Sequence, residues 1–532
     1  MLTQTVESRE WRGNPFPSVA EKRVSAVFRR VPRPIRLDIL TPMPTLLFEG
    51  SFFSDPGIRY QQGIVLLAVL LGPLLASLPI AARLRSNTRL ALGVILTLDL
   101  GYMLWATLPY VPFGIDESSF LINGHTLGGR DLFTGFMRPP LPTLGMRLMW
   151  FHPPLLGILL KLATTVLTYA LVARSIGHRW ALFAAWLVTA SSLMCEWSSY
   201  ALSEPYGAAC ATLFILLASR GSGAAGGVVA GLAFLCRFPL ALLLPFAAVA
   251  GGLRQRWWGA CLAVGFFFVP LVLILPWTHS DPLRVLLDRR DAYGEKSILL
   301  SIWFYLQPGR GLGLGLLGLL AAFWGAWRIR RVGSPELRWS AVLFFTYTAA
   351  MFVMGEQYLR YFTPVVPLGV VVVAHGCKRA LERFPALCRP VLAGLCAGVM
   401  AVQIAVPVQP PKIRKARIES RGMLILADRE QILDIVGDQF LYTDFDFLVL
   451  TAILGHPCPA VPQDPNVNHK HHPPGVELDL GIDESVSVDG VRRGTFSPVE
   501  RQDLSPGSFY LTYDPGGREP LWSAGDLCLI QW

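Results

Sequence analysis

The sequence predicts an all-α polytopic membrane protein followed by a small C-terminal α/β soluble domain. Of its 532 residues, 52% are hydrophobic and only 16% are charged, a composition too apolar for an ordinary soluble protein of this length. Runs of about 15 to 22 apolar residues recur between residues 62 and 408, and each is long enough to cross a hydrocarbon core about 30 Å thick. From Pro407 the sequence turns abruptly polar. These observations exclude a soluble multidomain enzyme.

The membrane domain is expected to cover residues 62–408 with about twelve transmembrane helices. A polar, basic N-terminal arm (1–61) precedes it and holds no apolar stretch of the signal-peptide type, so the first span is expected to act as the targeting signal. The expected spans are 62–82, 90–110, 154–174, 180–195, 205–219, 223–236, 238–252, 257–278, 311–328, 339–355, 363–377 and 389–408.

The distribution of basic residues predicts the orientation of the chain, because short cytoplasmic loops retain Lys and Arg. Such residues gather in alternate loops: Arg83, Arg85 and Arg89; Arg174 and Arg179; Arg220, Arg254 and Arg256; Arg328, Arg330, Arg331 and Arg338; Lys378, Arg379, Arg383 and Arg389. The segments 111–153, 279–310 and 356–362 are then extracytoplasmic, together with 409–532. An even number of spans also places the basic arm outside, against the usual bias, so its side stays open. Topology accounts for the net charge of +10 without a nucleic-acid partner.

The C-terminal domain, residues 409–532, is expected to be a small α/β module. We expect a helix at 428–436 and strands at 422–427, 439–442, 508–513 and 526–532.

Neither the cysteines nor the histidines form a metal-binding pattern. The nine cysteines include no CxxC pair, and most lie in or beside apolar runs as small buried thiols. Cys458 and Cys528 stand in polar sequence, where an oxidising compartment would allow them to pair. His469, His471 and His472 lie in a Pro-rich loop without a Cys or carboxylate partner, which favours a solvated loop.

Two adjacent carboxylates open the first large extracytoplasmic segment. Asp116 and Glu117 follow the span 90–110 by only a few residues. Partial shielding by the membrane would raise one carboxyl pKa while the other group stays ionised, as a general base requires. The alternative is a helix N-cap or a solvated pair. The same pentapeptide recurs at 481–485 in a polar setting that offers no shielding, and we interpret that copy as coincidence.

Two Pro-Pro pairs follow in the same segment. Because proline is favoured in the first turn of a helix, Arg138-Pro139-Pro140-Leu141 and His152-Pro153-Pro154-Leu155 predict a juxtamembrane helix at 139–151 and the start of the next span. Arg138 would then lie at a helix N-terminus, where a phosphate binds well. The alternatives are lipid anchoring for Arg138 and an ordinary loop histidine for His152.

Further charged or polar residues stand where spans are expected to reach the outer face: Glu204 before Pro205, Arg237 inside a long apolar stretch, and Glu356, Tyr358, Arg360 and Tyr361 before Pro364. Ionisable groups at membrane depth are costly and usually line a cavity or pair with each other. Arg237 interrupts the apolar stretch between two short spans. A purely structural ion pair of Arg237 with Glu204 or Glu356 is the alternative to a binding role.

Taken in order, these motifs resemble the polyprenyl-phosphate-sugar-dependent glycosyltransferases of the GT-C fold. The resemblance covers about 90–380 and is closest to the group that contains the lipid A aminoarabinose transferase and the protein O-mannosyltransferases. It is carried by Asp116-Glu117, Arg138-Pro139-Pro140-Leu141, Ala201-Leu202-Ser203-Glu204-Pro205, the stretch 231–239 around Arg237, and Arg360-Tyr361 with Pro364. The extra apolar run before the Asp-Glu pair and the C-terminal domain depart from the pattern.

The resemblance implies a membrane enzyme that moves a hexosyl or pentosyl group from a polyprenyl phosphate to a lipid, glycan or protein acceptor. It implies that Asp116 is the catalytic base and that Arg138 binds the donor phosphate. Arg237 and Arg360 are further phosphate ligands, Glu117 assists catalysis, and His152, Glu204, Tyr358 and Tyr361 are expected substrate contacts.

We expect no cofactor, with a divalent metal as an open alternative, and a site on the outer face of a bacterial inner membrane that serves cell-envelope glycolipids. The alternatives are a transporter or flippase of lipid-linked sugars and an oligosaccharide ligase. A transporter would be expected to show two related halves, and the sequence holds no internal duplication.

Overall fold

The structure is a computed structural model that describes thirteen segments of the chain. They are 87–108, 110–112, 115–127, 139–149, 152–274, 298–306, 314–354, 359–383, 421–443, 447–456, 458, 506–513 and 515–532. The expected spans 62–82 and 389–408 lie outside these residues, as do the arm 1–61, the histidine cluster and the second pentapeptide.

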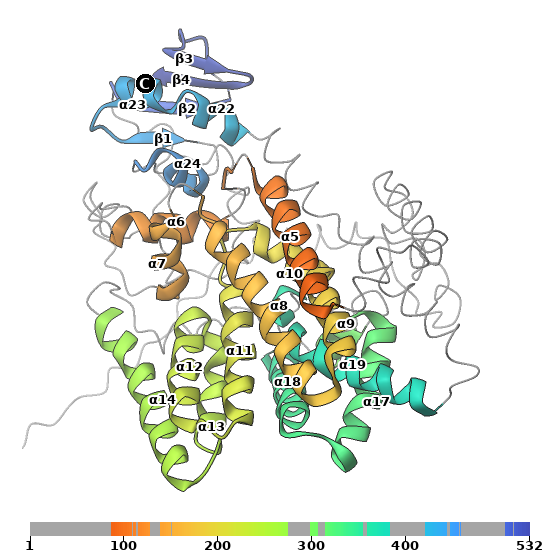
Figure 1. The fold of residues 1–532 in the computed structure, drawn as a ribbon. Helices are drawn as coiled ribbons and strands as arrows, with labels where there is room; N and C mark the ends of the chain where they lie inside the picture. Colours follow the sequence, from red (N-terminus) through yellow and green to blue (C-terminus); the bar gives the residue numbers. More distant parts are fainter. Residues whose placement is uncertain are drawn as a thin grey trace, which may run out of the picture. The chain divides into compact units, whose positions relative to one another are not determined.

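The described membrane domain is built from helices (Figure 1). They are α5 (Thr88–Thr107), α6 (Ile115–Leu127), α7 (Pro140–Leu148), α8 (Leu155–Ile176), α9 (His178–Thr189), α10 (Ser192–Ser199), α11 (Glu204–Ser219), α12 (Gly223–Cys236), η1 (Phe238–Leu242), α13 (Leu243–Ala247), α14 (Leu253–Ile274), α16 (Ile298–Leu306), α17 (Gly315–Val332), α18 (Pro335–Met354), η3 (Leu359–Val365) and α19 (Val366–Arg383).

Three helical segments within the described residues are long and apolar enough to cross a membrane, and a bent pair raises the number to four. They are α5, α8, and η3 together with α19. The expected spans 90–110, 154–174 and 363–377 are thereby confirmed. The expected span 180–195 is instead the bent pair α9 and α10. The prediction of one helix at 238–252 is wrong, because this stretch forms only η1 and the short α13. Pro239 and Pro245 lack the N–H that a continuous helix would need there.

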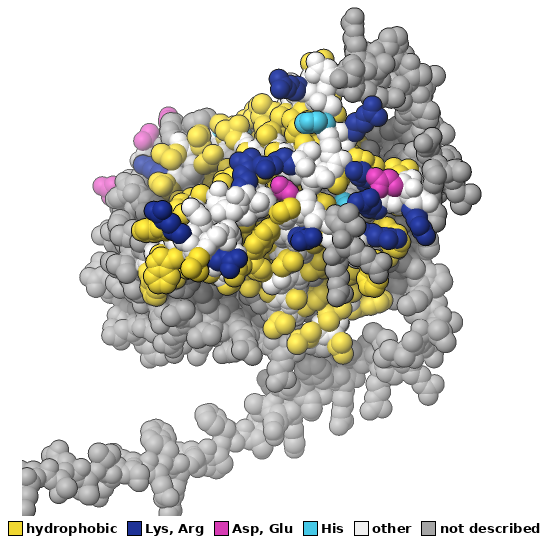
Figure 2. Space-filling model, turned by 60° about the horizontal axis from the view of Figure 1, so that its bottom comes forward, with side chains coloured by type: hydrophobic (Ala, Val, Ile, Leu, Met, Phe, Trp, Pro, Cys, Tyr) yellow, Lys and Arg dark blue, Asp and Glu magenta, His cyan; other side chains and the backbone are white. Residues whose placement is uncertain are grey.

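The helix ends sort into two groups. Near the start of α8 and α11, Gly157 lies against Pro205, so both helices begin at one end of the bundle. At the other end Arg174 pairs with Glu336 at 3.5 Å, and Lys378 Nζ donates to Ile176 O at 3.4 Å. Figure 2 shows Lys and Arg side chains spread over the lower face of Figure 1, with few acidic ones. Three of the loops predicted to share one membrane face, those that contain Arg174, Arg338 and Lys378, therefore meet.

Close helix crossings depend on glycine. Gly223, Gly227 and Gly231 repeat every four residues along α12, which packs on α14. A Cβ on Gly227 would collide with Gly259 O, and one on Gly231 would collide with Phe266. Small residues at such spacing let membrane helices approach to backbone contact.

The C-terminal residues form a four-stranded sheet with short helices. The helices are α22 (Arg421–Ala427), α23 (Arg429–Val436) and α24 (Phe447–Leu454), and the strands are β1 (Leu441–Thr443), β2 (Phe509–Thr512), β3 (Trp522–Ala524) and β4 (Leu527–Gln531). The strand order is β1-β2-β4-β3, with β1 parallel to β2 and the other pairs antiparallel.

Most of the elements predicted for this module are confirmed: the helix 428–436 and the strands 439–442, 508–513 and 526–532. The strand predicted at 422–427 is wrong, since these residues belong to α22. Gly422 and Ile425, three residues apart, are its buried positions. A short apolar run does not distinguish the helical repeat of 3.6 residues from the strand repeat of two. The buried positions lie at helical spacing, and the segment is a helix.

The suggested disulfide between Cys458 and Cys528 does not form, and both are free cysteines in the structure. Cys458 belongs to the apolar core that also contains Leu527 and Leu529 of β4. Because side chains alternate along a strand, Cys528 projects to the opposite face of the sheet. The two thiols therefore lie on different sides.

Candidate functional site

The two adjacent carboxylates lie in the first turn of α6 rather than in a loop. Glu117 is 2% exposed, and its Oε1 accepts the backbone N–H of Ala201 at 2.8 Å and the hydroxyl of Tyr110 at 3.3 Å. Acidic groups are favoured in a first turn by the helix dipole. Glu117 is thus neither an N-cap nor solvated. The Asp116 backbone begins the same turn, and its side chain lies outside the described residues.

The Glu117 carboxylate turns toward Ala201 and Tyr110, and these two contacts hold the first turn of α6 in place.

His152 is buried between the end of α5 and the start of α8. Its Nε2 lies 3.0 Å from Thr107 Oγ1, and its ring meets that of Tyr110 edge-on at 6.1 Å between centroids. The Thr107 hydroxyl donates its own hydrogen to Met103 O at 2.9 Å. Thr107 Oγ1 therefore accepts from His152, which places the ring proton on Nε2. Tyr110 thus contacts both His152 and Glu117.

Arg237 follows α12 directly and is 5% exposed. Its Nη1 lies 2.7 Å from Glu204 Oε1 and donates to Ser203 Oγ at 3.2 Å. The expected ion pair with Glu204 is therefore present. Nε and Nη2 of Arg237 and Oε2 of Glu204 are buried without a hydrogen-bond partner among the described residues. A buried donor without a partner is costly, so these two nitrogens favour the binding of an acceptor.

A second guanidinium stands nearby on η3. The guanidinium carbon of Arg360 lies 5.4 Å from the ring centroid of Tyr361, and that of Arg237 lies 4.8 Å from the same centroid. Arg360 also lies 5.8 Å from the ring of Trp197 on α10. Tyr361 therefore contacts two cations, of which Arg237 also has a carboxylate partner in Glu204.

The segment between α10 and α11 joins the carboxylate and the arginines. Ala201 holds Glu117 through its N–H, while Ser203 and Glu204 hold Arg237. Ala201 and Ser203 are two residues apart and so at most roughly 7 Å apart along the chain. The structure thus places an acidic group of α6 and a buried guanidinium on either side of one short segment.

Other expected site residues lie outside the described residues: Arg138, Glu356 and Tyr358. The helix that Arg138 was expected to precede is confirmed, because α7 begins at Pro140 with Pro139 as its N-cap. The next span is also confirmed, with Pro154 as the N-cap of α8. Within the described part of the chain, no three His, Cys, Asp or Glu side chains converge on a metal site.

Two contacts of the site and one buried ion pair elsewhere in the membrane domain were not predicted from the sequence. The Ala201 N–H is a backbone group with no signature in the sequence, and Tyr110 is one aromatic residue among many. Asp99 on α5 and Lys161 on α8 form a buried ion pair at 2.5 Å. Their signal was available, since each is a charge in the middle of an expected span.

No protein-family profile and no curated protein sequence matches this chain. Solved structures do match. The structure of ArnT from Cupriavidus metallidurans bound to undecaprenyl phosphate is similar with a TM-score of 0.54 at 13% sequence identity, over 79% of this chain and 92% of that chain. The apo form of the same protein gives 0.55 at the same identity and coverage.

The archaeal oligosaccharyltransferase AglB from Archaeoglobus fulgidus, in complex with an inhibitory peptide and a dolichol-phosphate, aligns with a TM-score of 0.44. It is 12% identical over 70% of this chain and 64% of that chain. The likeness to ArnT shows a shared fold, so the predicted resemblance to the GT-C fold is confirmed.

Proposed function

We propose that this chain is a membrane glycosyltransferase that moves a sugar from a polyprenyl phosphate to an acceptor hydroxyl at the extracytoplasmic face. One observation carries the proposal. The Ala201–Glu204 segment holds Glu117 of the Asp116-Glu117 turn on one side and the buried Arg237 on the other. Transfer from a phosphate needs a base and a group that stabilises a departing anion, and these are the two chemistries brought together.

The proposed reaction is a single displacement. The Asp116 carboxylate takes the proton of the acceptor hydroxyl as the acceptor oxygen attacks the anomeric carbon. The bond from that carbon to the phosphate oxygen breaks, and its electron pair leaves with the polyprenyl phosphate. Attack from the face opposite the leaving group inverts the anomeric configuration, and no covalent glycosyl-enzyme forms.

Arg237 is the proposed main ligand of the leaving phosphate. Its Nε and Nη2 are adjacent donors of one planar fork, so together they can grip two phosphate oxygens. The site is buried, and charge stabilisation is stronger there than in water. Arg360 and Arg138 complete the phosphate site in this proposal. The ion pair with Glu204 fixes the plane of the Arg237 guanidinium and so fixes the direction of its remaining donors.

Glu117 is proposed to position α6, and thereby Asp116, through Ala201 and Tyr110. His152, Tyr358 and Tyr361 are the proposed substrate contacts. No divalent metal is needed in this mechanism, because the arginines neutralise the leaving phosphate.

The donor class rests on the fold and on these arginines. ArnT, which has the same fold, was crystallised with undecaprenyl phosphate. The acceptor is a lipid, glycan or protein hydroxyl. We place the basic loops in the cytoplasm of a bacterial cell, which puts the site outside. In the same scheme 1–61 is an arm, 62–408 the membrane domain of about twelve helices, and 409–532 an extracytoplasmic α/β domain.

The test uses purified full-length protein in detergent, without a sealed compartment. It receives a short-chain polyprenyl phosphate sugar and a panel of acceptors, and release of free polyprenyl phosphate is measured. A transferase is expected to release polyprenyl phosphate under these conditions. Transport cannot contribute to the signal, because a detergent solution has no two compartments separated by a membrane. The proposal fails if no donor is consumed while sealed vesicles show movement of the lipid-linked sugar. Activity only with a diphosphate-linked oligosaccharide would point to a ligase instead.

A further inference from the structure

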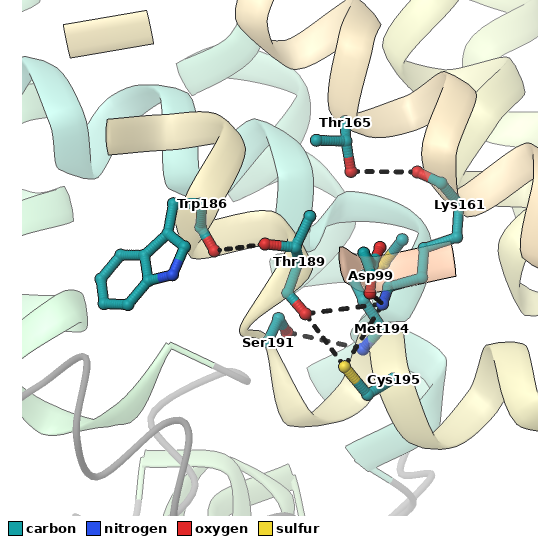
Figure 3. A network of polar contacts seen from close by, with 8 residues as sticks. All are labelled: Asp99, Lys161, Thr165, Trp186, Thr189, Ser191, Met194 and Cys195. Atoms are coloured by element: carbon teal, nitrogen blue, oxygen red, sulfur yellow. Dashed lines mark hydrogen bonds and ion pairs between the residues drawn. The ribbon is translucent and has the colours of Figure 1, made fainter. Parts of the chain in front are cut away.

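An ion pair is buried inside the membrane domain, away from the proposed site. Lys161 Nζ lies 2.5 Å from Asp99 Oδ1, and Lys161 is fully buried (Figure 3). The same ammonium donates to Thr189 O at 3.5 Å and to the sulfur of Cys195 at 3.3 Å. Cys195 Sγ in turn donates to Thr189 O at 3.0 Å. One lysine of α8 therefore contacts α5, the end of α9 and the start of α10.

Such a pair is a poor way to gain stability. Removing two charges from water costs as much as their attraction returns, and apolar residues of similar volume often serve as well or better. A buried pair can instead specify one register of the helices that carry it, because any other register would leave a buried charge without its partner. The three hydrogen-bonded contacts of Lys161 define one such register.

The elements that meet at Lys161 are the ones that build the carboxylate site. Asp99 lies eight residues, or about 12 Å, before the end of α5, which Tyr110 follows shortly. Lys161 lies about 9 Å from the first residue of α8, next to His152. Cys195 lies about 6 Å from the end of α10, two residues before Ala201.

We propose that the Asp99–Lys161 pair is a positioning device that sets the register of α5, α8 and α10 and so holds Glu117 between Tyr110 and Ala201. Its catalytic consequence rests on the proposed transferase function. The structural consequence does not, since the hydrogen bond from Ala201 N–H to Glu117 exists without substrate.

The direct readout is hydrogen–deuterium exchange of the Ala201 amide in the full-length protein, resolved to the single residue. Lys161→Met and Asp99→Asn are each expected to speed its exchange about tenfold or more, because the amide loses a fixed acceptor. Glu117→Ala shows the rate without that acceptor. Lys378→Met is the matched control, since Lys378 also has a carboxylate partner and a backbone acceptor, but at the opposite helix ends.

A single variant leaves an unpaired charge and could fail through misfolding, so the double variant Asp99→Leu/Lys161→Met decides. It is expected to restore the melting temperature in detergent while the Ala201 amide still exchanges fast. The charge swap Asp99→Lys/Lys161→Asp is expected to recover part of the protection. If the double apolar variant protects Ala201 as the wild type does, the pair is only a filler and the proposal is overturned.

Kinetics supply the second readout. In the double apolar variant, kcat for donor consumption is expected to fall about tenfold, because the first turn of α6 and the Ala201–Glu204 connection lose their fixed positions. The proposal is supported if kcat and the protection of the Ala201 amide from hydrogen exchange both decrease. A wild type that protects Ala201 and yet consumes no donor would count against the transferase function alone.

Discussion

Ala201 donates its backbone N–H to Glu117 Oε1 over 2.8 Å, although 84 residues separate the two along the chain. The contact fastens the first turn of α6 to the connection between α10 and α11. The next residues of that connection, Ser203 and Glu204, hold Arg237. A displacement of this connection would therefore move the carboxylates and the guanidinium at once.

The first prediction concerns the base. Asp116→Asn keeps the size of the side chain but removes its basicity, so turnover is expected to fall at least about 100-fold, a usual contribution of general-base catalysis. Expression and donor binding are expected to change little. The comparison is Asp483→Asn, the equivalent residue of the second pentapeptide, which is expected to leave activity unchanged. Near-normal turnover of Asp116→Asn would remove the base from the mechanism.

The second prediction concerns Arg237. Arg237→Lys keeps the charge but loses the planar fork, and turnover is expected to fall about 100-fold, as when one oxyanion donor is removed elsewhere. Arg220→Lys, an exposed arginine at the other end of α11, is the control and is expected to be silent. A transporter that merely attracts an anion would tolerate lysine at both positions. Equal activity of the two variants would contradict the proposed phosphate grip.

Much of the fold could be predicted because it depends on composition and on proline. Pro139 and Pro154 marked the starts of α7 and α8, and both became N-caps. The stretch after Arg237 was predicted wrongly as one span, because hydropathy alone does not register how Pro239 and Pro245 divide it.

The site was predictable only where its residues are unusual in kind. Arg237 stood out as a charge in apolar sequence, and its partner Glu204 was one of two candidates. The role of Ala201 was not predictable, since every residue carries the same N–H and only the tertiary structure selects one. The Asp99–Lys161 pair was not predicted, because the two charges lie 62 residues apart in different apolar runs and only the tertiary structure brings them together.

The third prediction tests the sidedness of the helix ends. In a background with Cys261→Ala, a cysteine at Arg147 on α7 is expected to react with a membrane-impermeant thiol reagent applied outside the cell. A cysteine at Arg220 is expected to stay unlabelled until the membrane is opened. Both positions are exposed in the structure. Labelling is compared with that of the Cys261→Ala parent protein. If the cysteine at Arg220 reacts from outside and the one at Arg147 does not, the proposed topology is inverted.

The fourth prediction concerns pH and the C-terminal module. Burial lowers the pKa of His456, although its Nε2 donates to Gln439 O at 2.5 Å. Above the unfolded pKa of about 6.5, this histidine is neutral in both the folded and the unfolded chain and does not change the free energy of unfolding. As the pH decreases below 6.5, the unfolded chain binds a proton that the folded chain does not yet bind. The free energy of unfolding therefore decreases, by about 1.4 kcal/mol per unit of pKa difference.

His456→Gln keeps a donor for Gln439 O without a titrating ring, and it is expected to flatten this dependence. Hydrogen exchange of amides in 506–532, followed from pH 7 to pH 5 and corrected for intrinsic rates, measures it in the full-length protein. An identical pH dependence in both proteins would exclude His456 as its source.

The last prediction uses the glycine crossing of α12 and α14. Gly227→Ala adds a single methyl group that would collide with Gly259 O, so the helices must separate, at an expected cost of about 1–3 kcal/mol. Gly265→Ala on α14 meets nothing within 4 Å and is the control, expected to be neutral or slightly stabilising. Because Arg237 directly follows α12, separation would also shift its guanidinium. Gly227→Ala is therefore expected to lower both the melting temperature in detergent and kcat. Equal melting temperatures for the two variants would show that α12 and α14 can accommodate the methyl group without loss of stability.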